Sequence, residues 1–384
     1  MDGYCKGVVK WSACKIRCAQ HGAEPRYFAT GAFFKKKAVS KNRRGCNRHT
    51  TRSRADTPSL PTRCPLTCIT MKTAIFCFAV LAVVALASAD QFDDWTAKFG
   101  KKYATLEETA HRRSVFFDNL KHVIALNADL KAQGHDQVYN TTIFMDMTRE
   151  EFKATHLNYV DKRVEHPTKS YDHSRDKASV DWRKHHVVTP VKNQGQCGSC
   201  WAFSATETVE SFWALAGHHL TELSPQQVTS CTTGCDGCGG GLPYVAYEYL
   251  ERAGLESAHA YPYRSGNGDT GRCEYNRHHV AAHVKGWSYV AQRGDWHSLR
   301  SAVSHDGPVS ICVDASTWQF YHGGVLSSNC GQQLDHCVQL VGYDDGHWLV
   351  RNSWTADWGI HGYIHIKMGK NLCGIANAAT IVHV

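Results

Sequence analysis

Residues 194–203, Gln-Gly-Gln-Cys-Gly-Ser-Cys-Trp-Ala-Phe, decide the fold of this chain. From Cys200 onward, apolar residues recur every three or four positions until Gly217, which predicts a helix with one face in the core. A thiol at a helix N-terminus feels the positive end of the helix dipole, which favours the reactive thiolate. Given a histidine and an orienting amide, Cys200 would be a nucleophile poised for acyl transfer.

Candidates for those two partners lie 136 and 152 residues further along the chain, at His336 and Asn352. His336 precedes an apolar strand pattern over 337–343, and a return strand is predicted over 347–354 after the turn signal Asp344-Asp345-Gly346. If the two strands pair at positions of equal parity, His336, Asn352 and Trp354 share one face. A slip of one residue would separate them.

This order and spacing resemble the papain family of cysteine proteases, and most closely its cathepsin L type. The resemblance implies an α+β, papain-like fold of two lobes. The left lobe is helical, the right lobe is β-barrel-like, and the active site lies between them, preceded by a helical propeptide. Period-two alternation from Val280 onward, for example over 363–368, also predicts a β-rich second half after a helical first half.

The resemblance and the chemistry together suggest roles for five groups. Cys200 attacks the peptide carbonyl, His336 protonates the leaving amine, and Asn352 orients the imidazole. Gln194 and the backbone N–H of Cys200 stabilise the oxyanion. Trp354 shields the His–Asn pair from water. Each residue alone has a simpler structural interpretation, but their joint order and spacing argue against it.

Substrate-binding residues are implied by the resemblance alone. Gly240 and Gly241 would let the substrate backbone approach closely, although Gly239 stands where the family generally has Asn. Thr355 likewise replaces a usual Gly. The pocket for the second substrate residue before the cut would be uncharged, which predicts a preference for Leu, Phe or Val over Arg. Asp335 is a further expected binding residue, next to Leu334 in the sequence. The pocket residues are Leu242, Pro243, Cys312, Leu334 and Ala378.

Ten cysteines follow residue 89, and the sequence alone leaves their pairing open. The resemblance implies the disulfides Cys197–Cys238, Cys231–Cys273 and Cys330–Cys373, with Cys200 unpaired. Cys312 and Cys337 lie in strand-like runs and are expected to be buried small residues. Cys235 has no expected role. An alternative is a zinc module, whose four thiolates would be Cys231, Cys235, Cys238 and Cys273, but no metal and no cofactor is expected.

The net charge of +8 is concentrated at the start of the chain. Residues 1–70 contain 15 Lys or Arg and 3 Asp or Glu, whereas the remaining residues contain 28 and 32. The part expected to fold is therefore slightly acidic, and no nucleic-acid partner is expected.

Residues 71–89 have the pattern of a secretory signal peptide. Met71-Lys72 precedes an apolar stretch that ends in Ala87-Ser88-Ala89 and is shorter than the roughly twenty residues of a membrane span. We expect cleavage after Ala89, with a buried helix as the alternative. We also expect that Met71 is the initiator and that the basic leader 1–70 is disordered or absent from the native protein. A signal anchor with a long leader is the alternative.

Residues 90–175 are predicted to form an inhibitory propeptide. One helical stripe with spacings of three and four resembles a propeptide motif of the family. Residues 144–152 resemble a second propeptide motif. The match to that second motif is incomplete, because Asn140 and Thr142 stand where the family usually has Gly and Asn. A solvated amphipathic helix is the alternative. Residues 166–178 predict an exposed linker, cut between about Tyr171 and Ser179. The stripe consists of Glu108, Arg112, Phe116, Asn119, Val123 and Asn127.

The catalytic domain is expected at 176–384, with a helical lobe at about 190–285 and a β-rich lobe at about 286–384. We expect a monomeric endopeptidase, made as a zymogen, that acts on proteins and peptides. Its propeptide would be an intramolecular inhibitor, and cystatin-type inhibitors are candidate partners. The secretory pathway would lead it to a lysosome-like acidic compartment or outside the cell. The alternative is an inactive homologue that acts as a binding protein.

Overall fold

The computed structural model describes residues 91–344 and 346–384. The predicted leader, the predicted signal peptide and the turn residue Asp345 lie outside the described residues. Within the described part, no helix is long and apolar enough to cross a membrane.

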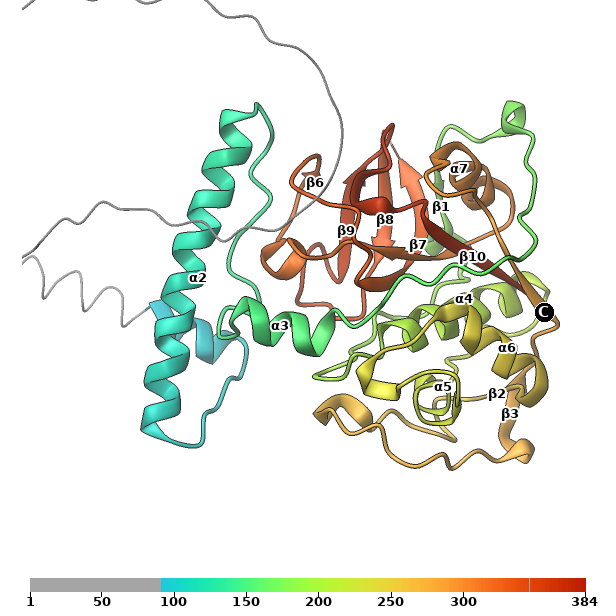
Figure 1. Ribbon diagram of the computed structural model, residues 1–384, viewed down its shortest axis with the longest axis horizontal. Coiled ribbons are helices and arrows are strands. Elements are labelled where there is room, and N and C mark those ends of the chain that lie inside the picture. Colours follow the sequence, from blue (N-terminus) through green and yellow to red (C-terminus); the bar gives the residue numbers. More distant parts are fainter. Residues whose placement is uncertain (1–90, 345) are drawn as a thin grey trace, which may run out of the picture. The chain divides into compact units, whose positions relative to one another are not determined.

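The first region is built on helix α2, Leu106–Ala132, which begins with Thr105 accepting the N–H of Glu108 (Figure 1). The predicted stripe faces protein, not solvent. Phe116 and Val123 are buried, and Asn119 donates to the carbonyls of Met145 and Met147 at 2.9 and 2.8 Å. The stripe therefore holds the second propeptide motif in place, and the alternative of a solvated helix is wrong.

A short helix, α3, carries the chain from this region toward the catalytic part (Figure 1). It spans Arg149–His156 and begins with a capping box in which Thr148 and Glu151 satisfy each other's backbone N–H groups. Arg112 on α2 reaches Glu151 at 2.8 Å, so the two helices are joined by an ion pair.

The central helix of the catalytic part is α4, Cys200–Leu215, which ends as predicted before Gly217 with φ +93°. The sequence predicted one buried face, but every residue from Cys200 to Ser211 is buried. This happens because α4 contacts α5 and α6 on one side and the sheet on the other. The remaining helices are α5 Pro225–Cys231, α6 Pro243–Ala253 and α7 Trp296–His305.

An eight-stranded sheet forms the other half of the catalytic part, in the order β4-β10-β5-β7-β8-β9-β6, with β1 paired to β7. No pairing joins the end strands β4 and β6 in the part that the structure describes, so the expected β-barrel-like lobe is an open sheet. β2 and β3 pair separately within the helical half. The strands are β1 Val180–Asp181, β2 Leu255–Glu256, β3 Val280–Ala282, β4 Gly286–Tyr289, β5 Val309–Val313, β6 Val325–Leu326, β7 His336–Asp344, β8 His347–Arg351, β9 Tyr363–Lys367 and β10 Ala378–His383.

The two halves meet through a buried polar network beneath α4. Arg351 of β8 is fully buried, lies 3.4 Å from Glu207 of α4, and donates to Gln339 of β7 at 2.7 Å. Gln339 in turn donates to the carbonyl of Glu207 at 2.8 Å. Burial raises the pKa of Glu207 to about 7, and the charge of Arg351 opposes that rise. This network ties α4, which begins at Cys200, to the strand pair whose first strand begins at His336.

The register of β7 and β8 meets the equal-parity condition on the His336 side of a bulge, but not on the turn side, where Asp344 pairs with His347. Gln339 pairs with Arg351 and Leu340 with Val350 before a bulge near Gly342. This register places His336 and Trp354 opposite each other just past the end of β8, and their rings stack with centroids 4.6 Å apart.

The structure contains the three disulfides that the resemblance implies and a fourth, Cys312–Cys337. The expectation of two separate small residues at 312 and 337 is wrong, because β5 and β7 pair in a register that sets these two residues directly opposite each other. The zinc alternative fails as well, since three of its four cysteines are in disulfides.

Candidate active site

Cys200 is the first residue of α4, is completely buried, and belongs to no disulfide. Burial raises the pKa of its thiol, and the backbone N–H groups of Cys337 and Trp201 oppose that rise. Cys337 directly follows His336 on β7. The expected nucleophile therefore lies beside the strand that carries the expected base, although the two come from different halves of the catalytic part.

The imidazole of His336 is oriented as predicted. Its Nε2 lies 2.8 Å from Oδ1 of Asn352, and both residues are fully buried. Because an amide oxygen can only accept, Nε2 carries the proton. The other ring nitrogen, Nδ1, has no hydrogen-bond partner among the described residues. With no proton of its own and no hydrogen-bond partner, Nδ1 can accept a proton from a neighbouring group.

Gln194 is fixed by residues of the opposite half. Its side-chain oxygen accepts the hydroxyl of Ser353 at 2.7 Å and the indole N–H of Trp354 at 3.1 Å. Its Nε2 donates to the carbonyl of Cys197 at 3.0 Å, and one N–H of the amide is left over. Trp354 thus does more than cover the His–Asn pair, because it also orients the amide of Gln194.

The segment that follows α3 lies directly on these groups. The backbone of Asn158 only partly opposes the rise that burial causes in the pKa of the Cys200 thiol, and the side-chain nitrogen of Asn158 lies 3.3 Å from the carbonyl of Cys238. A side chain at Gly240 (φ +123°) would collide with the carbonyl oxygen of Asn158. Gly240 is therefore the position where a second backbone passes closely. A side chain at Gly241 would meet the ring of Trp201, so that glycine serves internal packing.

Tyr159 occupies the expected substrate pocket. Its side chain packs in one cluster with Cys200, Cys312, Leu334 and Cys337, which Leu242 and Ala378 border. Its backbone N–H donates to the carbonyl of Asp335 at 3.0 Å. Of the predicted pocket residues, only Pro243, the first residue of α6, is absent from this cluster.

Burial disfavours charge on both Cys200 and His336 in the covered site. Burial raises the pKa of Cys200 to about 12 and lowers that of His336 to about 4, although the hydrogen bond to Asn352 acts in the opposite direction on His336. Burial also raises the pKa of Asp335 to about 7. At neutral pH the pair is therefore a thiol and an imidazole. Charging either group therefore costs free energy while the segment covers the site.

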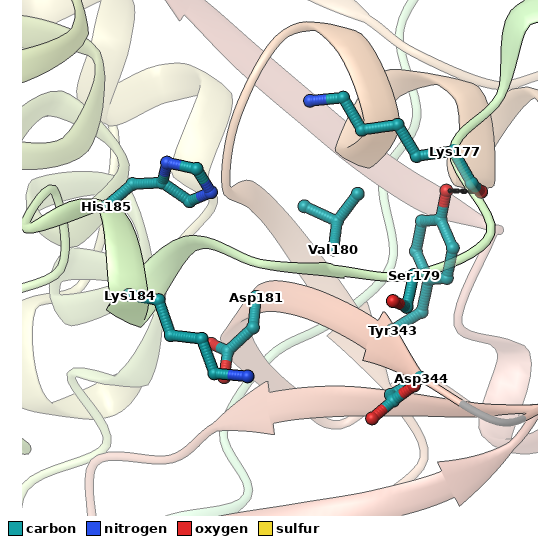
Figure 2. Close-up of a pocket in the computed structure, with 8 residues that line it drawn as sticks. All are labelled: Lys177, Ser179, Val180, Asp181, Lys184, His185, Tyr343 and Asp344. Carbon is teal, nitrogen blue, oxygen red and sulfur yellow. Dashed lines mark hydrogen bonds and ion pairs between the residues drawn. The ribbon is translucent and has the colours of Figure 1, made fainter.

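An open cavity lies elsewhere, at the expected maturation junction (Figure 2). It measures about 220 Å³ and is lined by Lys177, Ser179 and Tyr343, whose hydroxyl donates to the carbonyl of Lys177 at 2.7 Å. The junction is mostly exposed, as the linker prediction requires, but it is also anchored. The N–H of Lys177 donates to Ser304 of α7 at 2.9 Å.

Sequence reasoning missed three features of the site. These are the Cys312–Cys337 disulfide, the position of Tyr159 in the pocket, and His156, a buried histidine beside the catalytic residues. The cysteine pair had a detectable signal, since two cysteines in neighbouring strand patterns can face each other. A lone histidine or tyrosine in a polar propeptide gives no such signal.

Comparison with known families matches two stretches of the chain. Residues 177–383 match the papain family cysteine protease, and residues 92–152 match the cathepsin propeptide inhibitor domain. A digestive cysteine proteinase of Homarus americanus is 38% identical over 325 residues, covering 80% of this chain and 97% of that protein. A cysteine proteinase of Trypanosoma brucei brucei is 38% identical over 316 residues, covering 77% and 68%.

Solved proenzyme structures have the same fold. The digestive procathepsin L 3 of Tenebrio molitor superposes with a TM-score of 0.69 at 34% identity, covering 77% of this chain and 99% of that one. The recombinant stem bromelain precursor gives a TM-score of 0.71 at 32% identity, covering 78% and 99%. With its nucleophile helix, its His–Asn pair and the propeptide segment lying over both, this chain is a member of the papain family of cysteine proteases that carries its own cathepsin-type propeptide inhibitor domain.

Proposed function

We propose that this cysteine protease is an endopeptidase whose catalytic residues are Cys200, His336, Asn352 and Gln194. The observation that carries the proposal is the His336–Asn352 hydrogen bond of 2.8 Å, beside an unpaired cysteine at the start of α4. It leaves Nδ1 as the one imidazole nitrogen available for proton transfer to and from the thiol.

The reaction begins once the propeptide has left. His336 takes the thiol proton, and the Cys200 thiolate attacks the carbonyl carbon of the scissile bond. The oxyanion receives the free N–H of the Gln194 amide and the backbone N–H of Cys200. His336 then protonates the leaving amine, and water activated by the same imidazole hydrolyses the thioester. Asn352 holds the ring in the required orientation throughout.

Endopeptidase specificity is supported by the path of the propeptide. Residues 156–159 cross the site from α3, and the chain continues beyond it, where Arg163 donates to the carbonyls of Asn377 and Ala291 at 3.0 and 2.9 Å. A groove that accepts a continuous chain through both ends also accepts the interior of a substrate. The pocket that holds Tyr159 supports a large uncharged side chain at the second position before the cut.

The remaining functional proposals concern the setting. We propose a signal peptide at 71–89, a propeptide at 90–175 and a catalytic domain at 176–384, with the cut between about Tyr171 and Ser179. The enzyme would be monomeric, open to cystatin-type inhibitors, and delivered through the secretory pathway to an acidic compartment or outside the cell. Disulfides on both sides of the active site suit an oxidising route.

The test is cleavage of a peptide blocked at both ends by acid-matured protein. Internal cleavage that is abolished by Cys200→Ser supports endopeptidase action. Cleavage only of peptides with a free terminus would show an exopeptidase. No cleavage of any peptide would favour an inactive homologue that acts as a binding protein.

A further inference from the structure

Tyr263 lies behind the two groups proposed to bind the oxyanion. Its hydroxyl is 2.9 Å from the carbonyl oxygen of Gln194 and 2.8 Å from Oγ of Ser199. The carbonyl can only accept, so the single phenolic proton points to Gln194. Ser199 must then donate to Tyr263, which makes a chain of two hydrogen bonds, from Ser199 to Tyr263 and on to Gln194.

Both ends of this chain of hydrogen bonds are next to a group proposed to donate to the oxyanion. Gln194 supplies its side-chain amide, and Ser199 is the residue before Cys200, whose backbone N–H is the second donor. A serine in the N-cap position normally accepts an N–H from the first turn of its helix. Ser199 makes no such bond, and its hydroxyl lies against Tyr263 instead. Both Gln194 and Ser199 are fully buried, so water cannot easily replace the phenol.

One other contact of Gln194 also reaches the helical half, since its Nε2 donates to the carbonyl of Cys197, which accepts the N–H of Ser199 as well. The side-chain oxygen and backbone N–H of Gln194 bind Ser353 and Trp354, which belong to the sheet half. Tyr263 belongs to the helical half, and its ring packs edge-on against Phe203 of α4 with centroids 4.9 Å apart. The loop that carries Tyr263 makes one more contact with this segment, because the carbonyl of Gly266 accepts the N–H of Gln196 at 2.8 Å.

We propose that Tyr263 is a positioning residue that sets the spacing between the Gln194 amide and the backbone N–H of Cys200. This inference rests on the proposed function, in which those two groups stabilise the oxyanion. Negative charge develops on the carbonyl oxygen only in the transition state, so a loosened pair of donors affects the chemical step more than substrate binding. Losing a donor entirely costs roughly 100-fold to 1000-fold in kcat, so a displaced donor costs less.

The test compares Tyr263→Phe with wild-type enzyme, both matured from the full chain. The ring and its contact with Phe203 remain, and only the hydroxyl is lost. We expect kcat for a peptide substrate to fall roughly 10-fold, with KM changed less than about twofold. Affinity for a peptide aldehyde, whose adduct with Cys200 places an oxygen in the oxyanion site, should fall by a similar factor. Alkylation of Cys200 by iodoacetamide needs no oxyanion site and should keep its rate.

The matched control is Tyr261→Phe, which removes a hydroxyl that donates to the carbonyl of Arg272 at 3.0 Å. This variant should keep wild-type kcat and aldehyde affinity. A second variant, Ser199→Ala, breaks the other end of the chain and should reproduce the loss in kcat. The double variant Tyr263→Phe with Ser199→Ala should lose no more than either one, because both break the same link. If Tyr263→Phe does not fold, Ser199→Ala decides through the same readouts.

Three results would overturn the positioning role: wild-type kcat in Tyr263→Phe, equal losses in alkylation and turnover, or additive losses in the double variant. Failure of the proposed function would look different. In that case the wild-type enzyme itself would show no turnover of the peptide and no aldehyde binding at Cys200.

Discussion

His156, the last residue of α3, packs edge-on against the indole of Trp354, with ring centroids 5.8 Å apart. It also stacks on Phe152 at 4.9 Å and is 3% exposed. Its Nδ1 lies 2.7 Å from the hydroxyl of Thr155, which already donates to the carbonyl of Glu151. The titratable or charged groups whose fields reach the ring are His336 from β7 and Lys101 from the propeptide, and both are basic.

The propeptide should therefore release in acid partly through His156. Burial, followed by the charge of His336, lowers the pKa of docked His156 from 6.5 to about 3. The docked state prefers the neutral ring, so docking is undiminished above about pH 6.5 and weakens as the pH falls toward 3. At pH 4.5 this one residue should weaken docking roughly 100-fold, since each pH unit is worth a factor of ten.

The measurement is the pH at which half of the zymogen processes itself in a fixed time. His156→Met keeps an apolar contact with Trp354 but cannot be protonated, and its midpoint should move at least about one pH unit toward acid. His166 is the matched control, since it stacks on Trp287 and not on Trp354 beside His336. His166→Gln should keep the wild-type midpoint. An unchanged midpoint in His156→Met would remove this residue from the pH response.

Asn352→Ala should slow catalysis and change its pH dependence. A hydrogen bond to a charged group contributes about 1.5–3 kcal/mol, so kcat should fall roughly 10-fold to 100-fold. The bond to Asn352 also raises the pKa of His336, and losing it lets the imidazolium deprotonate at lower pH. The alkaline limb of the pH–rate profile should move toward acid. A loss of activity without that movement would mean that Asn352 does not act through the imidazole.

The mature enzyme should prefer apolar side chains at the second position before the cut. The cluster that receives Tyr159 consists of thiol, disulfide and aliphatic groups, and Ala378 at its edge carries no charge. Desolvating an arginine there without a partner costs several kcal/mol. A panel of otherwise identical peptides with Phe, Leu, Val or Arg at this position should show Arg as the slowest by at least about 10-fold. Faster cleavage of the Arg peptide would refute this description of the pocket.

The Cys312–Cys337 disulfide should stabilise the sheet half. It closes a loop with a sequence separation of 25 residues, for which chain entropy gives about 3.5 kcal/mol. Replacing both cysteines (Cys312→Val with Cys337→Ala) in an inactive Cys200→Ala zymogen should lower the free energy of unfolding in urea by about that amount. Cys235→Ala is the control, since the thiol of Cys235 is unpaired and only accepts the N–H of Leu242 at 3.4 Å. An equal loss in both variants would mean that the cross-link itself contributes nothing.

The parts of the fold that could be predicted depend on local patterns. Neighbouring residues alone determine the helical period of α4, its end before Gly217 and the alternating burial of β9. The structure has all three where they were expected. The juxtaposition of His336 and Asn352 was conditional on register, and the turn alone does not fix it, because a bulge near Gly342 shifts the pairing by one residue between the turn and the site. The site could thus be proposed from the sequence because its histidine and amide lie on one hairpin.

The features that could not be predicted depend on pairing between distant segments. Whether the sheet closes is decided by its end strands β4 and β6, and no local signal specifies that contact. The Cys312–Cys337 pair depends on the β5–β7 register in the same way. The importance of His156 arises only when α3 lies across Trp354. In the sequence it is one histidine among 24.

The most direct test of the account is covalent labelling of the acid-matured protein with an epoxysuccinyl peptide, followed by mass mapping of the adduct. We expect one label, on Cys200, with loss of all peptidase activity, and no label in the intact zymogen, where the thiol is covered and its pKa is raised to about 12. A label on Cys235, or full activity after complete labelling of Cys200, would contradict the assignment of the nucleophile.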